Sequence, residues 1–310
     1  MNYTEIIDWL LDGDIAIQYQ VHRDLLYTER NDLRKRIAKE GWGNRYLSLR
    51  KTNGHWGDGF YQPKWISTHY TLLDLKNLGI SSDCIPIKQT LNLVIETQKG
   101  EDGGINPGKT VKNSDVCING MALNYFCYFG IDTDKLKSIV DFILSQRMID
   151  GGFNCRFNRQ GARHSSLHTT ISVLEGILEY KNNNYNYRLG DLLEAEETSR
   201  EFILEHRIFR SDKTGEIIDK RMLSLPFPFR WKYDILRALE YYYFAGAEYD
   251  ERMQDALHMI LKKRNKNGTW KLQANHPGKV HFNMEVPGKP SRWNTLRALR
   301  VLKYFEIIEH

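Results

Sequence analysis

A glycine-containing turn recurs along this chain at intervals near 50 residues, with one longer interval of about 64. Its copies are Gly54-His55-Trp56-Gly57, Asp102-Gly103-Gly104-Ile105, Asp150-Gly151-Gly152-Phe153, Thr214-Gly215-Glu216-Ile217 and Asn267-Gly268-Thr269-Trp270. A helical pattern of apolar residues precedes each turn, and a second one follows it. A period of this length is typical of architectures that repeat one supersecondary unit, so the unit here is a helical hairpin.

The pattern predicts six hairpins, each with a first and a second helix. The first helices are expected at about 3–11, 32–49, 84–98, 134–146, 189–207 and 250–264. The second helices superpose on one leucine each, in the segments Tyr19 to Leu25, His69 to Leu75, Cys117 to Leu123, His168 to Leu174, Tyr233 to Leu239 and Trp293 to Leu299. The second helices are the more apolar set, as an inner ring would be, and the first are striped with charge.

Hairpins in series bury their apolar faces by stacking on one another, either as an open solenoid or as a closed double ring. The difference in polarity between the two sets of helices favours the closed form. We therefore expect an all-α (α/α)6 toroid that forms a single domain over residues 1–310. The glycines would reverse the chain tightly, while Trp56, Phe153 or Trp270 packs between the layers.

Composition and charge argue against several classes of protein for this sequence, among them nucleic-acid-binding and membrane-spanning proteins. The net charge of +5 includes no polybasic block, so no nucleic-acid partner is expected. The start of the chain lacks a basic segment followed by an apolar one, and no apolar run reaches about 18 residues, so neither a secretory signal nor a membrane span is expected. The four cysteines form no CxxC pair. These features favour a cytoplasmic protein.

One position in each hairpin falls at the start of the second helix, toward one mouth of the predicted central cavity. The six residues there are Tyr19, His69, Cys117, His168, Tyr233 and Trp293. Three consecutive members are His, Cys and His, and Asp115 precedes Cys117 by two residues. A thiolate, an imidazole and a carboxylate are usual zinc ligands, and three protein ligands leave a position open for substrate. Asp115, Cys117 and His168 are therefore candidate zinc ligands.

The turns resemble those of the terpenoid cyclase and protein prenyltransferase α/α toroids, in which Gln-x-x-x-Asp-Gly-Gly-aromatic recurs. The resemblance spans the chain, with Gln98 to Ile105 and Gln146 to Phe153 as its best copies, while the turns at Gly215 and Gly268 are degenerate. It implies the toroid fold and less about function, because one fold hosts unrelated activities.

The resemblance also implies which side chains form a site. Class II cyclases carry Asp-x-Asp-Asp where this chain has Asp115-Val116-Cys117-Ile118, so the position of the protonating acid holds a cysteine, which argues against a cyclase. Prenyltransferase β subunits carry Asp-x-Cys there and a histidine on the next inner helix, similar to Asp115, Cys117 and His168. Their diphosphate-binding basic residues, six and three before the aspartate, match Lys109 and Lys112.

The sequence departs from that family as well. Ile118, Met121 and Leu167 stand where prenyltransferases usually have aromatic residues, and nothing identifies the helical partner subunit that those enzymes need. Each residue also has a structural interpretation: Cys117 as a small buried residue, Asp115 as a helix cap in competition with Ser114, and both lysines as a solvated loop. His69, Tyr233 and Trp293 are expected to contact substrate or to pack the mouth.

Three functions remain open on this basis. The first is a zinc-dependent transferase that acts on a thiol and an isoprenoid diphosphate or similar anion. The second is a toroid that binds a small molecule in its central cavity without catalysis. The third is a carbohydrate-active (α/α)6 barrel, which would use two of the inner-helix acids Asp74, Glu175, Asp234 and Glu240.

Two loops are further candidates for the mouth. The segment 275–285 would be either a lid or a long ordered connection. The basic loop with Arg156, Arg159 and Arg163 would suit either an anion or solvent.

Overall fold

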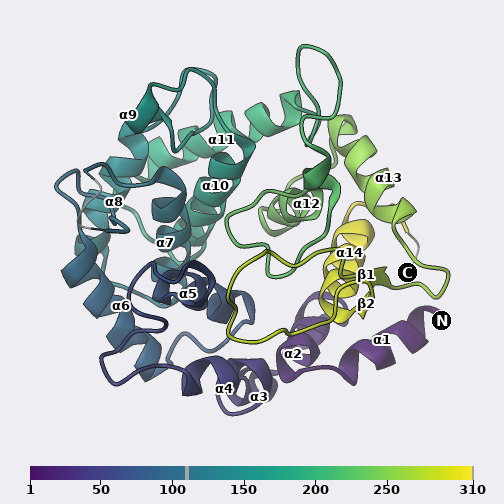
Figure 1. The fold of residues 1–310 in the computed structure, drawn as a ribbon. Coiled ribbons are helices and arrows are strands. Elements are labelled where there is room, and N and C mark those ends of the chain that lie inside the picture. Colours follow the sequence, from purple (N-terminus) through teal and green to yellow (C-terminus); the bar gives the residue numbers. More distant parts are fainter. Residues whose placement is uncertain (109–111, 309–310) are drawn as a thin grey trace. The chain divides into compact units, whose positions relative to one another are not determined.

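A computed structural model describes residues 1–108 and 112–308, and it is all-α apart from one pair of very short strands (Figure 1). The α-helices are α1 (Tyr3–Leu11), α2 (Ile15–Asp24), α3 (Asn31–Arg36), α4 (Gly41–Ser48), α5 (Thr68–Asn77), α6 (Ile85–Gln98), α7 (Val116–Tyr128), α8 (Thr133–Ser145), α9 (Phe157–Gln160), α10 (Leu167–Asn182), α11 (Leu189–Glu205), α12 (Ile235–Phe244), α13 (Gln254–Lys262) and α14 (Arg292–Tyr304). Strands β1 (Trp270–Lys271) and β2 (Pro290–Ser291) pair antiparallel. Short 3-10 turns occupy Lys64–Ile66, Lys220–Leu223 and Glu251–Met253.

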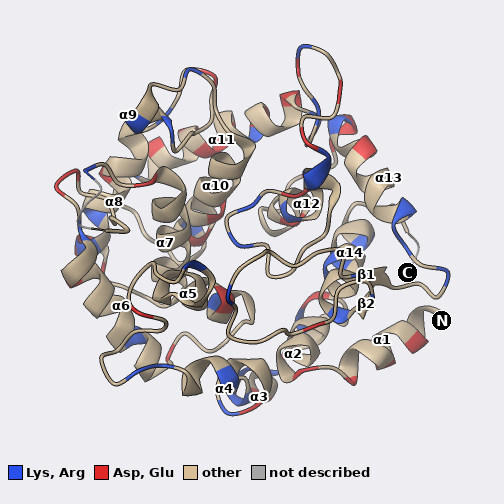
Figure 2. Ribbon diagram, viewed as in Figure 1, with Lys and Arg blue, Asp and Glu red and all other residues tan. Residues whose placement is uncertain are grey.

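The chain divides into two compact units. Unit 1 consists of Met1–Ser48, Asn77–Ser81 and the chain from Leu204 onward, and unit 2 consists of Leu49–Lys76 and Ser82–Ile203. Figure 2 shows acidic and basic residues interspersed along α11 and α13, two of the helices predicted to be charge-striped. Within the described ranges, no helix is both long enough and apolar enough to cross a bilayer.

Helices α7 and α10 form the tightest packing of unit 2. A Cβ atom added at Gly120 would lie 2.5 Å from the carbonyl oxygen of Ser172, and one at Gly176 would lie 2.5 Å from the carbonyl oxygen of Gly120. The two backbones therefore meet without intervening side chains, which only glycine permits. The contact fixes the start of α7 relative to that of α10.

The repeated turns have the tight geometry that the sequence predicts. Gly54, Gly103, Gly151, Gly215 and Gly268 all have positive φ, between 71° and 92°. The aromatic residues Trp56, Phe153 and Trp270 are fully buried. Their backbone N–H groups each donate to a threonine at 3.0 Å: Thr68, Thr170 and Thr295, respectively. These three turns are thus hydrogen-bonded to the first four residues of the helix that follows each of them.

Unit 1 has a charged core between α2, α12 and α14. Arg300 bonds Asp24 at 2.5 Å and Glu240 at 2.7 Å, and Arg297 bonds Glu240 at 2.5 Å. All four side chains are buried. Such a network is strongly destabilised when one partner is removed, because the remaining charge is left buried and unpaired.

Several predicted boundaries were wrong. The helix expected at 32–49 is broken into α3, which ends at Arg36, and α4, which begins at Gly41, where the φ of 58° sets the start of the second helix apart from regular helix. The helix expected at 250–264 begins as a 3-10 turn capped by Asp250 and ends at Lys262. Tyr233 lies before α12, which Asp234 caps by accepting a hydrogen bond from the N–H of Arg237.

Candidate functional site

The loop before α7 positions Asp115 and Cys117. Asp102, in the preceding glycine turn, accepts hydrogen bonds from the N–H and the hydroxyl of Ser114, both at 2.7 Å. In the next repeat, Asp150 likewise accepts hydrogen bonds from the N–H of Ser165 at 2.8 Å and from its hydroxyl at 2.5 Å, just before α10. Ser114 is therefore hydrogen-bonded to the glycine turn and does not cap α7. Asp115 is the N-cap residue of α7, although its carboxylate makes no capping hydrogen bond.

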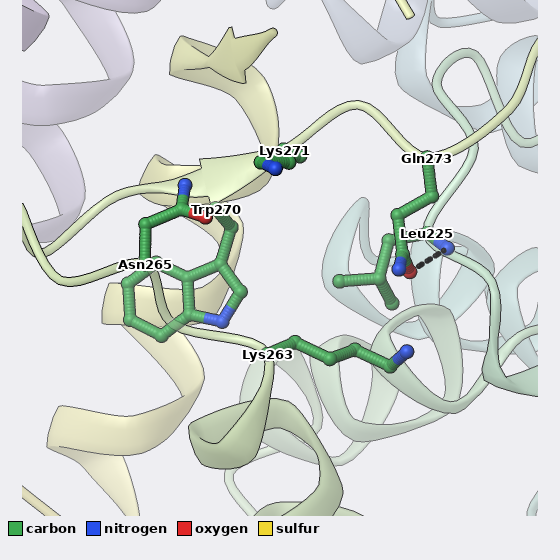
Figure 3. A pocket seen from close by; sticks show the side chains of 6 residues that line it. All are labelled: Leu225, Lys263, Asn265, Trp270, Lys271 and Gln273. Atoms are coloured by element: carbon green, nitrogen blue, oxygen red, sulfur yellow. Dashed lines mark hydrogen bonds between the residues drawn. The ribbon is translucent and has the colours of Figure 1, made fainter. Parts of the chain in front are cut away.

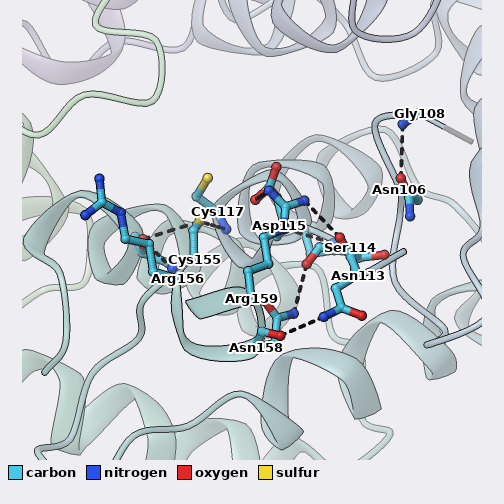
Figure 4. A network of polar contacts seen from close by, with 12 residues as sticks. Asn106, Gly108, Asn113, Ser114, Asp115, Cys117, Cys155, Arg156, Asn158 and Arg159 are labelled. Atoms are coloured by element: carbon cyan, nitrogen blue, oxygen red, sulfur yellow. Dashed lines mark hydrogen bonds and ion pairs between the residues drawn. The ribbon is translucent and has the colours of Figure 1, made fainter. Parts of the chain in front are cut away.

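The Asp115 carboxylate instead pairs with Arg159, at 2.9 Å between Nη1 and Oδ1 (Figure 4). Arg159 also donates to the carbonyl of Asn113 at 2.8 Å. Asn158 donates to the carbonyl of Ser114 at 3.1 Å and accepts from the side chain of Asn113 at 2.6 Å. These bonds fasten α9, which carries Asn158 and Arg159, to the loop before α7.

Cys155 lies beside Cys117 at this junction (Figure 4). Its sulfur accepts a hydrogen bond from the backbone N–H of Cys117 at 3.1 Å and another from the hydroxyl of Thr169 at 3.5 Å. The backbone N–H of Cys155 donates to the same hydroxyl at 3.2 Å. Because Thr169 is in the first turn of α10, Cys155 joins the starts of the two helices. Both cysteines are free and partly exposed.

The contact between the two thiols shifts their pKa values in opposite directions. The Cys117 thiol donates a hydrogen bond to the Cys155 sulfur, and this bond, reinforced by burial, raises the pKa of Cys117 well above its ordinary value. The same bond lowers the pKa of Cys155, helped by the hydroxyl of Thr169. Burial raises the pKa of Asp115, against the opposing effect of Arg159.

His168 immediately precedes Thr169 in α10 and is partly exposed. The structure thus brings the turn that carries His168 to the Cys117 and Cys155 pair. Among residues 1–108 and 112–308, no three His, Cys, Asp or Glu side chains converge as a metal-binding group.

A cluster of aromatic residues surrounds His69 in α5, and one of them, Tyr61, lies near the two site cysteines. The ring of His69 lies between those of Phe60, Tyr61, Tyr70 and Tyr125, at centroid distances of 5.5, 5.7, 4.8 and 5.7 Å. Its Nδ1 is 3.1 Å from the hydroxyl of Tyr125. Burial lowers the pKa of His69 to about 3, so the imidazole is neutral at physiological pH. Tyr61 is close enough to both site cysteines and to Asp115 to feel their charge, although burial is the main reason for its raised pKa.

The register of His69 differs from the predicted one. In four of the repeats, the backbone N–H of the residue after the glycine turn donates a hydrogen bond to a side chain of the following helix. The acceptors are Thr68, Thr170 and Thr295, and, for the N–H of Ile105, the side chain of Asn119 at 2.6 Å. Aligned on these acceptors, His69 corresponds to Gly120 rather than to Cys117. It therefore lies inside α5, fully buried, and not at the rim of a mouth.

The predicted basic residues are only partly placed. Lys109 lies outside the described residues, and Lys112 is exposed. Lys64, which the sequence did not single out, lies near the site: its charge lowers the pKa of His69, and its ammonium lies 5.9 Å from the Tyr61 ring centre. Arg156 and Arg163 are exposed.

Tyr233 and Trp293, also predicted to contact substrate, belong to unit 1. The Tyr233 hydroxyl donates to the carbonyl of Ile208 at 2.5 Å, so this buried side chain is used in packing. Trp293 is buried and stacks on Phe227 and Trp42, at centroid distances of 4.5 and 6.0 Å. Both side chains therefore pack the interior of their unit.

The segment 275–285 is an ordered connection within unit 1. Phe282 packs on Tyr46 at 4.7 Å between ring centres. Glu285 accepts the backbone N–H of Arg292 at 2.6 Å and bonds the hydroxyl of Ser291, and thereby holds the start of α14. These contacts favour the ordered connection over a lid.

The inner-helix acids are distributed over both units. In unit 1, Glu240 is paired with two arginines and Asp234 caps α12. In unit 2, Asp74 is buried in α5 and Glu175 is partly exposed in α10. The contacts of Asp234 and Glu240 give both carboxylates a structural role.

A pocket of about 210 Å³ lies in unit 1, where α13 meets β1 (Figure 3). It is lined by Leu225, Lys263, Asn265, Trp270, Lys271 and Gln273. Gln273 accepts from the N–H of Leu225 at 3.0 Å, which closes one side. None of the predicted site residues lines this pocket.

No protein-family model matches the sequence, and a search of curated proteins gave no significant match.

Proposed function

We propose that this chain is a zinc-dependent transferase of the prenyltransferase type, which joins a thiol to an isoprenoid diphosphate or a similar anionic substrate. The observation that carries the proposal is the contact of Cys117 and Cys155 where α7 and the His168 turn of α10 meet. Thiolate and imidazole are ligands that zinc prefers. Within this proposal the hairpins close into an (α/α)6 toroid with the substrate in its central cavity.

The chain's own groups have distinct tasks in this proposal. Cys117 and His168 would hold the metal, and Asp115 would be the third ligand if its carboxylate left Arg159. Lys64, Lys112 and Arg159 supply the positive charge for an anionic substrate. When bound, zinc provides a Lewis acid that keeps a substrate thiol deprotonated at neutral pH.

A second candidate is a small-molecule-binding toroid without catalysis. The ion pair of Asp115 with Arg159 favours it, because that pair already satisfies one of the predicted zinc ligands.

Metal content of the purified, untagged protein separates the two candidates. The transferase predicts zinc equimolar with the chain, measured by plasma emission spectrometry, and its loss in Cys117→Ser. Cys84→Ser is the matched control, since Cys84 is a partly exposed free cysteine of unit 2 that precedes α6. An absence of zinc even after incubation with the ion at neutral pH would reject the transferase and leave the binding protein. If zinc is present, thiol alkylation with prenyl diphosphates is the next assay.

A further inference from the structure

The pocket of about 210 Å³ where α13 meets β1 has two lysines in its wall, Lys263 and Lys271 (Figure 3). Lys263 is partly buried, and Lys271 is exposed. In the part of the chain that the structure describes, neither ammonium group has a carboxylate partner or a hydrogen bond. A partly buried ammonium gives up hydration, which an anion in the pocket would replace.

The electrostatics of Lys263 agree with this geometry. Burial lowers the pKa of its ammonium group, and no carboxylate among the described residues raises it again. No acidic side chain lines the pocket either. The pocket therefore has positive charge in its wall and lacks the negative charge that would balance it.

This positive charge departs from the repeat in which it lies. Counted from the glycine of each turn, Lys263 occupies the position of Gln98 and Gln146 in the two best copies. Lys271 occupies a position at which both of those copies have asparagine. The glycines of all three turns nevertheless have the same left-handed backbone, with φ between 82° and 92°. The turn itself therefore does not require a lysine at either position.

The rest of the wall is suited to a small molecule with an apolar part. Leu225 is apolar, and the indole N–H of Trp270 already donates to the carbonyl of Ile260 at 2.7 Å, so that ring adds apolar surface. The side-chain oxygen of Gln273 accepts the N–H of Leu225 at 3.0 Å, which leaves its amide NH2 to donate. The volume is below the roughly 300–1,000 Å³ of pockets for drug-sized ligands, so the ligand is small.

We propose that this pocket binds a phosphate monoester, with the phosphate between the ammonium groups of Lys263 and Lys271 and a small apolar group in the rest of the pocket. A phosphate monoester carries a charge of about −1.5 to −2 at neutral pH, which matches two ammonium groups. Lysine binds phosphate as a point charge. A carboxylate would leave one lysine unpaired. All the lining residues belong to unit 1, so the inference goes beyond the transferase proposed for unit 2.

Titration calorimetry of the full chain with phenyl phosphate tests this inference, because the probe joins one phosphate to one small apolar ring. Lys263→Gln and Lys271→Asn introduce the residue types of the two best copies. Each should weaken binding by roughly 10- to 100-fold, as expected for the loss of one hydrogen bond to a charged group. Benzoate, with one charge, should bind the wild type more weakly than phenyl phosphate. Lys266→Gln is the matched control, since Lys266 is an exposed lysine of the same turn that does not line the pocket.

Lys112→Gln separates this pocket from the anionic-substrate site of the proposed function, because Lys112 belongs to unit 2. This variant should bind phenyl phosphate as the wild type does. Wild-type affinity in both Lys263→Gln and Lys271→Asn, or no saturable binding to the wild type, would overturn the inference and leave the transferase proposal standing. Binding that is weakened by Lys112→Gln alone would also overturn it and assign the anion to unit 2.

A measurement on the unmutated protein guards against misfolding of the variants. Acetic anhydride should acetylate Lys263 and Lys271 more slowly when phenyl phosphate is present, as quantified by mass spectrometry. Lys266 serves as the internal reference and should react equally with and without the probe. Equal acetylation of Lys263 under both conditions would contradict a phosphate bound at its ammonium group.

Discussion

Gly120 decides how closely α7 approaches α10. In Gly120→Ala, the new methyl would meet backbone atoms of Ser172 and Val173 within 2.7 Å, and backbone cannot rotate away. The helices would have to separate, which we expect to lower the free energy of unfolding by about 1–3 kcal/mol. Chemical denaturation measures the change. Zinc affinity should fall as well, since Cys117 is one turn away.

Gly190 is the matched control for this prediction. It lies at the start of α11 with no atom near the position of an added Cβ. Gly190→Ala should be neutral or slightly stabilising, because alanine favours helix over glycine by up to about 1 kcal/mol. Equal effects of the two substitutions would show that the close helix contact is not limiting.

Asp234 gives a prediction about pH. Burial raises its pKa to about 6, above the ordinary value of 3.8, so Asp234 binds its proton more tightly in the folded chain than in the unfolded chain. The unfolded chain therefore binds fewer protons between about pH 4 and 6, and the carboxylate's contribution becomes destabilising as pH rises through that window. Below about pH 4 this effect is absent.

Asp234→Asn should therefore be more stable than wild type by about 1–3 kcal/mol at pH 7.5 and equally stable near pH 4. The amide oxygen can still accept the N–H of Arg237 as the helix cap. Thermal unfolding at both pH values measures the difference. Lower stability of the variant at pH 7.5 would mean that the attraction of Arg297 to the carboxylate outweighs its burial.

At the scale of the element, the features that were predicted correctly are those set by residues close together in the sequence. The glycine turns, the buried aromatic residues and most helices follow from the repeat itself. The break between α3 and α4 was missed because the apolar pattern continues across it. His69 was aligned by helical periodicity, which tolerates a shift of one turn, whereas the hydrogen bond of Trp56 to Thr68 sets the actual register.

The same limit explains which candidate residues the sequence could propose. Cys117 and His168 were proposed because they occupy the same position in neighbouring hairpins, and Asp115 because it precedes Cys117 by two residues; their role as metal ligands stays a prediction. Cys155 and Lys64 come from loops whose length differs between repeats, so no periodic position marks them. The one available signal for Cys155 was its place two residues after the Phe153 turn, between the other two candidates.

Thr170 allows the turn-to-helix hydrogen bond to be tested. Thr170→Val keeps the shape of the side chain but leaves the buried N–H of Phe153 without its acceptor. We expect a loss of about 1–3 kcal/mol in the free energy of unfolding, measured with denaturant. Thr170→Ser retains the hydroxyl and should lose less. If valine and serine behave alike, packing of the methyl group matters more than the hydrogen bond.

At the scale of the molecule, the candidate zinc ligands all belong to unit 2, and the buried ion network of α2, α12 and α14 belongs to unit 1. Unit 2 therefore contains the proposed chemistry, and unit 1 contains Tyr233 and Trp293, which pack its interior. A ligand that binds only the folded chain raises stability in proportion to the logarithm of its concentration over Kd. Metal binding can thus be detected through unfolding without any assay of activity.

We expect zinc at about 100 times its Kd to stabilise the chain by about 2.7 kcal/mol, which corresponds to a rise of several degrees in Tm for a protein of this size. The rise should vanish in Cys117→Ser, remain in Cys84→Ser and be absent when magnesium replaces zinc, because thiolate and imidazole ligands select zinc. Differential scanning calorimetry at fixed protein concentration measures all four cases. An equal rise in wild type and Cys117→Ser would place zinc on other side chains and remove the thermodynamic support for a metal site between α7 and α10.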